Sequence, residues 1–255
     1  MADAEDPHGY SRSRREAEAI HRDADSVQRQ AEVLGRNAEA VKAFADRKNP
    51  FWPAQATVLA AIVLDLGLPD KLTIGPRWML PVFEGVLVVG LVIASPRPNF
   101  KHSALRRQVA MSLIGLVSTA NLYSLVELVR YLLHGGQAGG RTLIIAGVVL
   151  WWTNVLLFGL WYWELDRGGP MRRLLVPDAL PDFLFPQMTE KKVAPKGWIP
   201  GLIDYLYTSF TNATAFSPTD TMPLTYTAKI LMTVQSSAAL VTLGLVVARA
   251  VNILS

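Results

Sequence analysis

The sequence of 255 residues contains no cysteine. This absence excludes a disulfide scaffold, a cysteine nucleophile and any metal site built on thiolates. The four histidines are scattered without the spacing of metal ligands, and the chain has neither a glycine-rich phosphate loop nor a nucleophile elbow. We therefore expect no enzyme, no catalytic residue, no bound metal and no cofactor.

Charged residues are scarce over most of the chain. Of the 46 Lys, Arg, Asp and Glu residues, 19 lie within positions 1–49, so the other 206 residues carry only 27. The mean hydropathy of +0.24 averages over this division. Because the charge-poor part holds long apolar runs, it is typical of a membrane protein rather than of a soluble domain or a disordered chain.

The pI near 9.4 is also compatible with nucleic-acid binding. However, the basic residues outside the first 49 positions flank the apolar runs. Anionic lipid headgroups account for basic residues in that position. We therefore expect membrane lipids as partners and no nucleic acid.

Residues 1–49 are polar but have a clear period of seven. Apolar residues alternate with alanines along this stretch at Ile20, Ala24, Val27, Ala31, Leu34, Ala38, Val41 and Ala45. The 4-3-4-3 spacing predicts the seam of a coiled coil, and hence an oligomerisation helix. An amphipathic helix that packs on its own protein or on the membrane surface fits the same pattern. Asn49 and Pro50 are expected to end this helix.

Beyond residue 49 the chain alternates apolar spans with short polar connections. Four spans cover 52–68, 78–94, 109–133 and 143–163, and a last one covers 228–254. Each approaches or exceeds the roughly 20 residues that cross a hydrocarbon layer of about 30 Å. We therefore predict a transmembrane region of four helices over 50–163, and a proline-rich interfacial loop over 164–197.

Ionisable residues inside apolar spans are costly and by default indicate function or pairing. Glu84 lies seven residues into the second span and is a candidate functional carboxylate, with a buried hydrogen bond between helices as the alternative. Glu127 and Arg130 lie three positions apart in the third span. Residues at this spacing share one helix face, so we expect them to form a structural ion pair.

The segment from Asp204 to Pro223 resembles the pore loop of tetrameric potassium channels. It contains Tyr-x-Ser-Phe at Tyr207, Ser209 and Phe210, a threonine at Thr214 and the closing Asp-x-x-Pro of Asp220 and Pro223. The resemblance covers about 50 contiguous residues, or some 110 with the fourth span. It implies that residues 198–255 form a pore helix, a filter and an inner helix, with 143–163 as the outer helix.

The sequence departs from that family where the filter is expected, because Ser217, Pro218 and Thr219 stand in place of Gly-Tyr-Gly. The family's glycines take backbone conformations that residues with side chains resist, and Pro218 fixes its own φ. We therefore expect no potassium filter of the family's geometry. The candidate pore residues are Thr214, Ala215, Phe216, Ser217, Pro218, Thr219 and Asp220. The hydroxyl groups of this segment either line a less selective polar constriction or bond to neighbouring helices.

The distribution of basic residues predicts an orientation. With the N-terminus in the cytoplasm, 19 Lys and Arg residues fall on the cytoplasmic side of the spans and three on the other side. We expect an all-α, multi-pass protein of a bacterial-type plasma (inner) membrane. It has five to six transmembrane helices, depending on whether residues 198–216 form a re-entrant segment or a full span.

These patterns favour an ion-channel-like protein, a homo-oligomer in which residues Thr214–Asp220 conduct a monovalent cation. The alternative is a non-conducting membrane scaffold or sensor whose N-terminal helix binds a partner. A proton-coupled transporter that uses Glu84 and the Glu127–Arg130 pair has less support, because no inverted repeat is visible.

Overall fold

The computed structural model divides the chain into two compact units, Met1–Lys48 and Asn49–Ser255. It describes residues 52–65, 103–134, 140–176, 179–190, 192, 194–195, 198–214 and 220–254, together with single positions between 25 and 39 and between 82 and 86.

In the first unit the described positions are helical and exposed. The guanidinium of Arg29 donates a hydrogen bond to the carbonyl of Asp25 one turn earlier, at 3.1 Å. Val27, which belongs to the predicted seam, is 62% exposed in the single chain. The coiled coil stays a prediction, since most of its seam lies outside the described residues.

The second unit is mostly helical. Three of its helices are long and apolar enough to cross a membrane, over Ala110–Leu133, Gly140–Gly168 and Tyr226–Arg249. The described elements are α2 (Trp52–Asp65), α4 (Ser103–Leu133), α5 (Gly140–Leu165), η3 (Asp166–Gly168), α6 (Pro170–Leu175), β1 (Phe183–Leu184), α7 (Pro186–Thr189), α8 (Leu202–Thr214), β2 (Met222–Pro223) and α9 (Tyr226–Leu254).

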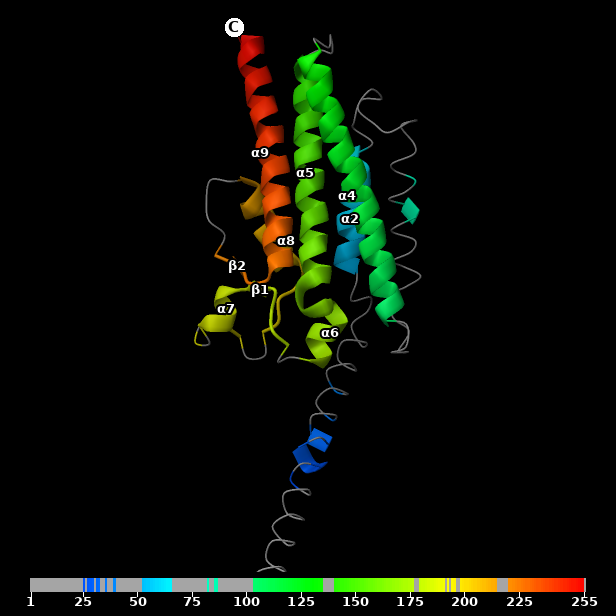
Figure 1. The fold of residues 1–255 in the computed structure, drawn as a ribbon, viewed down its shortest axis with the longest axis vertical. Helices are drawn as coiled ribbons and strands as arrows, with labels where there is room; N and C mark the ends of the chain where they lie inside the picture. Colours follow the sequence, from blue (N-terminus) through cyan, green and yellow to red (C-terminus); the bar gives the residue numbers. More distant parts are fainter. Residues whose placement is uncertain are drawn as a thin grey trace, which may run out of the picture. The chain divides into compact units, whose positions relative to one another are not determined.

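Helix α5 lies at the centre of this unit, in contact with α2, α4, α8 and α9 (Figure 1). Glycines on α5 allow two of these helices to approach closely. A Cβ atom at Gly159 would lie 3.1 Å from the Cα of Leu206 on α8, and one at Gly147 would clash with a methyl carbon of Val246 on α9. Small residues are the usual means of close helix approach in membrane proteins.

Helix α8 begins beside the C-terminal end of α5 and ends beside the middle of α5. Near its start, the Tyr205 hydroxyl bonds to Asp166, and at its end the carbonyl of Ala213 accepts a hydrogen bond from the indole of Trp151 at 3.4 Å. Its 13 residues rise about 20 Å, which is less than the roughly 30 Å of a hydrocarbon layer.

After α8 the chain returns to the end of α5 from which α8 started. Strand β2 pairs antiparallel with β1, in the register Phe183 with Pro223 and Leu184 with Met222. The amide of Leu224 then donates to the carbonyl of Asp182 at 2.8 Å. Helix α9 starts from this point and runs antiparallel to α5, since Gln235 lies beside Asn154 and Val246 beside Gly147.

Three of the five predicted spans correspond to described helices that are long and apolar enough to cross a membrane. The spans at 109–133, 143–163 and 228–254 correspond to α4, α5 and α9, although α4 begins six residues earlier than predicted. The first span corresponds to the shorter α2, whereas the span at 78–94 lies almost wholly outside the described residues. The proline-rich stretch at 164–197 contains short helices and β1 in addition to loop.

The close packing at Gly159 yields a testable prediction. Gly159→Leu is expected to lower the free energy of unfolding by about 1–3 kcal/mol, because the clash with the α8 backbone cannot be relieved by a side-chain rotation. The measurement is thermal unfolding of the purified protein in detergent. Gly244→Leu is the matched control, since a Cβ atom at Gly244 meets nothing within 4 Å. Equal melting temperatures for the two variants would contradict the packing.

Candidate functional site

A polar cluster lies where α5 ends. The apolar run of α5 stops at Trp163, and the next residues include the buried carboxylates of Glu164 and Asp166. Arg167 has a φ of 53°, and Gly168 and Gly169 also have positive φ, so the chain turns sharply here. Pro170 then starts α6 in the first helical turn, where a missing amide hydrogen costs nothing.

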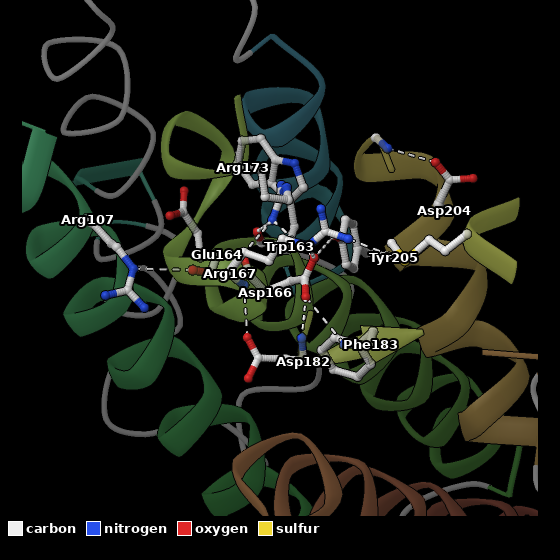
Figure 2. Close-up of polar contacts among 12 residues, drawn as sticks. Arg107, Trp163, Glu164, Asp166, Arg167, Arg173, Asp182, Phe183, Asp204 and Tyr205 are labelled. Atoms are coloured by element: carbon white, nitrogen blue, oxygen red, sulfur yellow. Dashed lines mark hydrogen bonds and ion pairs between the residues drawn. The ribbon is translucent and has the colours of Figure 1, made fainter. Parts of the chain in front are cut away.

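The Asp166 carboxylate is fully buried and receives several hydrogen bonds (Figure 2). The Tyr205 hydroxyl donates to Oδ2 at 2.6 Å, while the backbone amides of Asp182 and Phe183 donate to Oδ1 at 2.7 and 3.3 Å. The guanidinium groups of Arg167 and Arg173 lie 3.9 and 4.0 Å from Oδ2. A buried carboxylate is tolerated when it is paired and bonded in this way.

Arg173 connects the same cluster to the last turn of α5. Its Nη1 donates to the carbonyls of Trp163 and Asp166 at 2.6 and 3.0 Å, which satisfies two acceptors at the helix end. Its guanidinium also lies over the Tyr205 ring, 5.0 Å from the centroid. Burial raises the pKa of the Tyr205 phenol well above its ordinary value, so this group stays a neutral donor to Asp166.

Asp182 extends the cluster to the start of α9. Its carboxylate accepts from the Arg167 amide and from the Thr225 hydroxyl, both at 2.8 Å. The Thr225 oxygen in turn accepts from the amide of Ala228 in the first turn of α9, at 3.3 Å. The cluster therefore joins the end of α5, the loop before β1, the start of α8 and the start of α9.

A second polar group lies among the apolar helices and is centred on Gln235 of α9, which is fully buried. Its amide nitrogen donates to the carbonyl and to the hydroxyl of Ser209 on α8, at 2.9 and 2.6 Å. Its amide oxygen accepts from the Tyr162 hydroxyl on α5 and, at 2.8 Å, from Asn212 on α8. One side chain thus bonds to both neighbouring helices.

Two amides and a hydroxyl complete the Gln235 group. Asn154 of α5 donates to the Gln235 carbonyl at 3.4 Å, and Asn212 also donates to the Met232 carbonyl at 3.0 Å. Ser236 donates to the side-chain oxygen of Asn212 at 3.0 Å. Hydrogen bonds of this kind hold helices together where lipid cannot supply partners.

Side chains donate hydrogen bonds to backbone carbonyls in the last turn of α8. The carbonyl of Thr211 accepts from the Thr214 hydroxyl, that of Asn212 from Ser236, and that of Ala213 from Trp151. Aromatic rings surround this helix end, because Phe210 stacks on Trp152 and meets Trp151 edge to face, each at 5.8 Å between centroids. A helix that stops between other helices needs such partners for its last carbonyls.

The predicted pore residues are only partly described. Thr214 closes α8, Asp220 is exposed, and Ala215, Phe216, Ser217, Pro218 and Thr219 lie outside the described residues. The hydroxyls of α8 bond within the chain. Thr208 donates to the Asp204 carbonyl, Ser209 to the Val155 carbonyl on α5, and Thr211 to the Tyr207 carbonyl.

The predicted pairing of Glu127 with Arg130 is confirmed, with Nη1 and Oε1 separated by 3.2 Å. Glu84 lies outside the described residues. Within the described part of the chain, no group of three His, Asp or Glu side chains has the arrangement of a metal site.

Asp166, Arg173 and Gln235, which are central to the two polar groups, were not predicted from the sequence as site residues. A signal for the second group was present, since Asn154 and Gln235 are amides inside long apolar runs. The first group had no such signal, because its charges stand in a proline-rich loop where solvent exposure is the ordinary expectation.

Comparisons of the chain with known protein families, curated proteins and solved structures found no match. The functional assignment therefore rests on the chemistry and geometry of the chain itself.

The Asp166 cluster yields a second prediction. Asp166→Asn keeps the side-chain shape but removes the negative charge, which leaves Arg173 buried without its counter-ion. Removal of one partner from a buried ion pair costs about 3 kcal/mol, and so we expect a lower melting temperature in detergent. Asp220→Asn, at an exposed carboxylate, is the control and should leave the melting temperature unchanged. Equal stability of both variants would show that the cluster contributes little.

Proposed function

We propose that the chain is a multi-pass protein of the plasma (inner) membrane and forms an oligomeric cation pore. In this proposal α8 and residues 215–219 are a re-entrant segment, and α9 lines the path. The observation that carries it is the course of the chain around α8. Helix α8 enters beside the end of α5, stops beside Trp151, and the chain is back at the same end of α5 by Met222.

The orientation of α8 supports a cation as the permeant species. The C-terminal end of an α-helix carries a partial negative charge, and this end of α8 lies beside the middle of α5. Half-helices that end inside a membrane coordinate ions in this way in transporters. The polar residues that follow, together with the exposed Asp220 carboxylate, would add oxygen ligands along the path.

The surface of α8 supports assembly from several copies. Ile203 and Tyr207 are exposed and lie four positions apart, so they share one face of α8. This face is opposite the one that packs on α5 and α9. In the proposed homo-oligomer, neighbouring copies cover this face. Ser217 and Thr219 stand where the potassium-channel pattern has its two glycines, and Pro218 stands at its tyrosine, which favours a pore of low selectivity for monovalent cations.

A non-conducting scaffold or sensor is the alternative, with the N-terminal helix binding a partner. The observation that favours it is the complete use of the Thr208, Ser209 and Thr211 hydroxyls in bonds within the chain. These three hydroxyl groups therefore already have hydrogen-bond partners within the single chain. A pore would rely on Thr214, residues 215–219 and Asp220 instead.

The re-entrant course of α8 can be tested by cysteine labelling, because the natural chain has no cysteine. Lys192→Cys and Asp220→Cys lie before and after α8, and both positions are exposed. In spheroplasts and inverted vesicles, a membrane-impermeant maleimide should label both from the same side. With the N-terminus in the cytoplasm and four preceding spans, that side is the cytoplasm. Labelling from opposite sides would show that residues 198–216 form a full span.

The pore can be tested by cation flux through the purified protein in liposomes. Asp220→Asn should lower the flux of a monovalent cation several-fold at low ionic strength and less at high ionic strength, since salt screens an exposed charge. Glu190→Gln is the control, as Glu190 is an exposed carboxylate outside the proposed path. If the natural protein conducts under none of voltage, pH change or membrane tension, the scaffold alternative holds.

A further inference from the structure

A groove with a volume of about 250 Å³ runs between α4 and α9, with α5 as its floor. It extends along α5 from Trp161, near the C-terminal end of that helix, to Leu150 near the middle. Thr119, Leu122 and Val234 line it and are exposed, so the groove opens on the outer surface of the helices. When the helices span a membrane, an open groove of this kind meets the lipid chains.

The wall of the groove suits an apolar chain. No Lys, Arg, Asp or Glu among the described residues lines it. The Ser118 hydroxyl accepts from the indole of Trp161 at 3.0 Å, and the hydroxyls of Thr119 and Thr242 donate to carbonyls of their own helices. The rise from Leu150 to Trp161 is about 16 Å, which is about half of a hydrocarbon layer of about 30 Å. The groove therefore has the length of one leaflet.

A first arginine lies just beyond the Trp161 end of the groove. Glu164 is three positions past Trp161, and its carbonyl accepts a hydrogen bond from Nε of Arg107 on α4 at 3.3 Å (Figure 2). Arg107 lies three helical turns before Ser118, so it shares the face of α4 that lines the groove. Its guanidinium is therefore placed at one end of the groove.

The glycine turn after α5 brings a second arginine to the same end. A Cβ atom at Gly168 would lie 2.8 Å from Cδ of Arg172, which belongs to α6. A Cβ atom at Gly169 would lie 3.6 Å from Cδ of Arg107. Because the two glycines are adjacent, the two arginine side chains lie against one turn of backbone.

The distribution of charge at this turn favours an anion. Arg172 is exposed and forms no ion pair with a described residue, whereas the carboxylate of Glu164 beside the same turn is buried. The Asp166 carboxylate lies instead beside Arg167 and Arg173. An anion that approaches from the membrane surface therefore meets arginine before it meets a carboxylate. Arginine binds phosphate oxygens through charge-assisted hydrogen bonds.

We propose that the groove and the two arginines together bind one anionic phospholipid. One acyl chain lies in the groove, and the headgroup phosphate bonds to Arg107 and Arg172. Basic pockets between helices on the cytoplasmic side are typical sites for anionic headgroups. In the orientation proposed above, the C-terminal end of α5 lies on that side. The site needs a bilayer but no conduction, so its test is independent of the cation flux.

Trp161 lines the groove and reports its occupancy, because bromine quenches indole fluorescence on contact. The probe is phosphatidylglycerol with brominated acyl chains, and phosphatidylcholine with the same chains is the comparison without net charge. Either lipid replaces part of the phosphatidylcholine in liposomes that contain the purified full chain. The Trp161 signal is the difference between the natural protein and Trp161→Phe. We expect half-maximal quenching of this signal at an about fivefold or more lower mole fraction of brominated phosphatidylglycerol than of brominated phosphatidylcholine.

Two variants separate the headgroup from the chain. Arg172→Gln should reduce the preference for phosphatidylglycerol about fivefold, the effect of one basic residue near an anionic surface. Arg141→Gln, at an exposed arginine near the other end of α5, is its matched control and should leave the preference unchanged. Ala238→Phe fills the groove and should weaken quenching by both lipids. Ala248→Phe, at an exposed position of the same helix, should weaken neither.

Several results would overturn the proposal. Equal half-maximal mole fractions for the two lipids would show that Trp161 meets only the general lipid shell. A preference that survives Arg172→Gln would place the headgroup elsewhere. Quenching that is unaffected by Ala238→Phe would place the acyl chain outside the groove. Loss of the preference in inorganic phosphate, but not in potassium chloride of equal ionic strength, would assign the arginines to a free anion.

Discussion

The arrangement of α5, α8 and α9 depends on one buried carboxylate. Asp166 lies at the point where α5 ends, and the groups that bond to it come from the loop before β1, from α6 and from α8. Transfer of a charge out of water is so unfavourable that these partners must all be in place together. The three short segments are thereby fixed against the end of α5, and α8 acquires a defined starting point.

The Gln235 group determines how far α8 extends. The Gln235 side chain bonds to both α5 and α8. Two carbonyls at the end of α8 accept hydrogen bonds from Ser236 and Trp151. Without these donors a helix that ends among apolar helices would leave several backbone acceptors unsatisfied. The position of Gln235 in α9 is therefore matched to the length of α8.

Long apolar runs in the sequence predicted α4, α5 and α9, because an uninterrupted apolar stretch of about 20 residues or more is typical of a membrane-spanning helix. A re-entrant segment or a full span was predicted over residues 198–216, and α8 covers Leu202–Thr214 of this stretch. Apart from the adjacent Arg167, the partners of Asp166 could not be predicted, since they lie 7 to 39 positions away and meet only through tertiary packing. The same holds for the groove, which depends on the spacing of three helices. The pore assignment stays a proposal, because its central residues lie outside the described part of the chain.

The pairing of β1 with β2 has a consequence for biogenesis. It joins Phe183 to Pro223 and so closes a ring of chain that contains α8. Helices α5 and α9 are apolar enough to insert one after the other as independent spans, whereas α8 carries polar groups that are satisfied only by those two helices. In a two-stage view of membrane folding, α8 therefore docks after synthesis of α9 has begun. The docking of α8 is thus a late event in the folding of the chain.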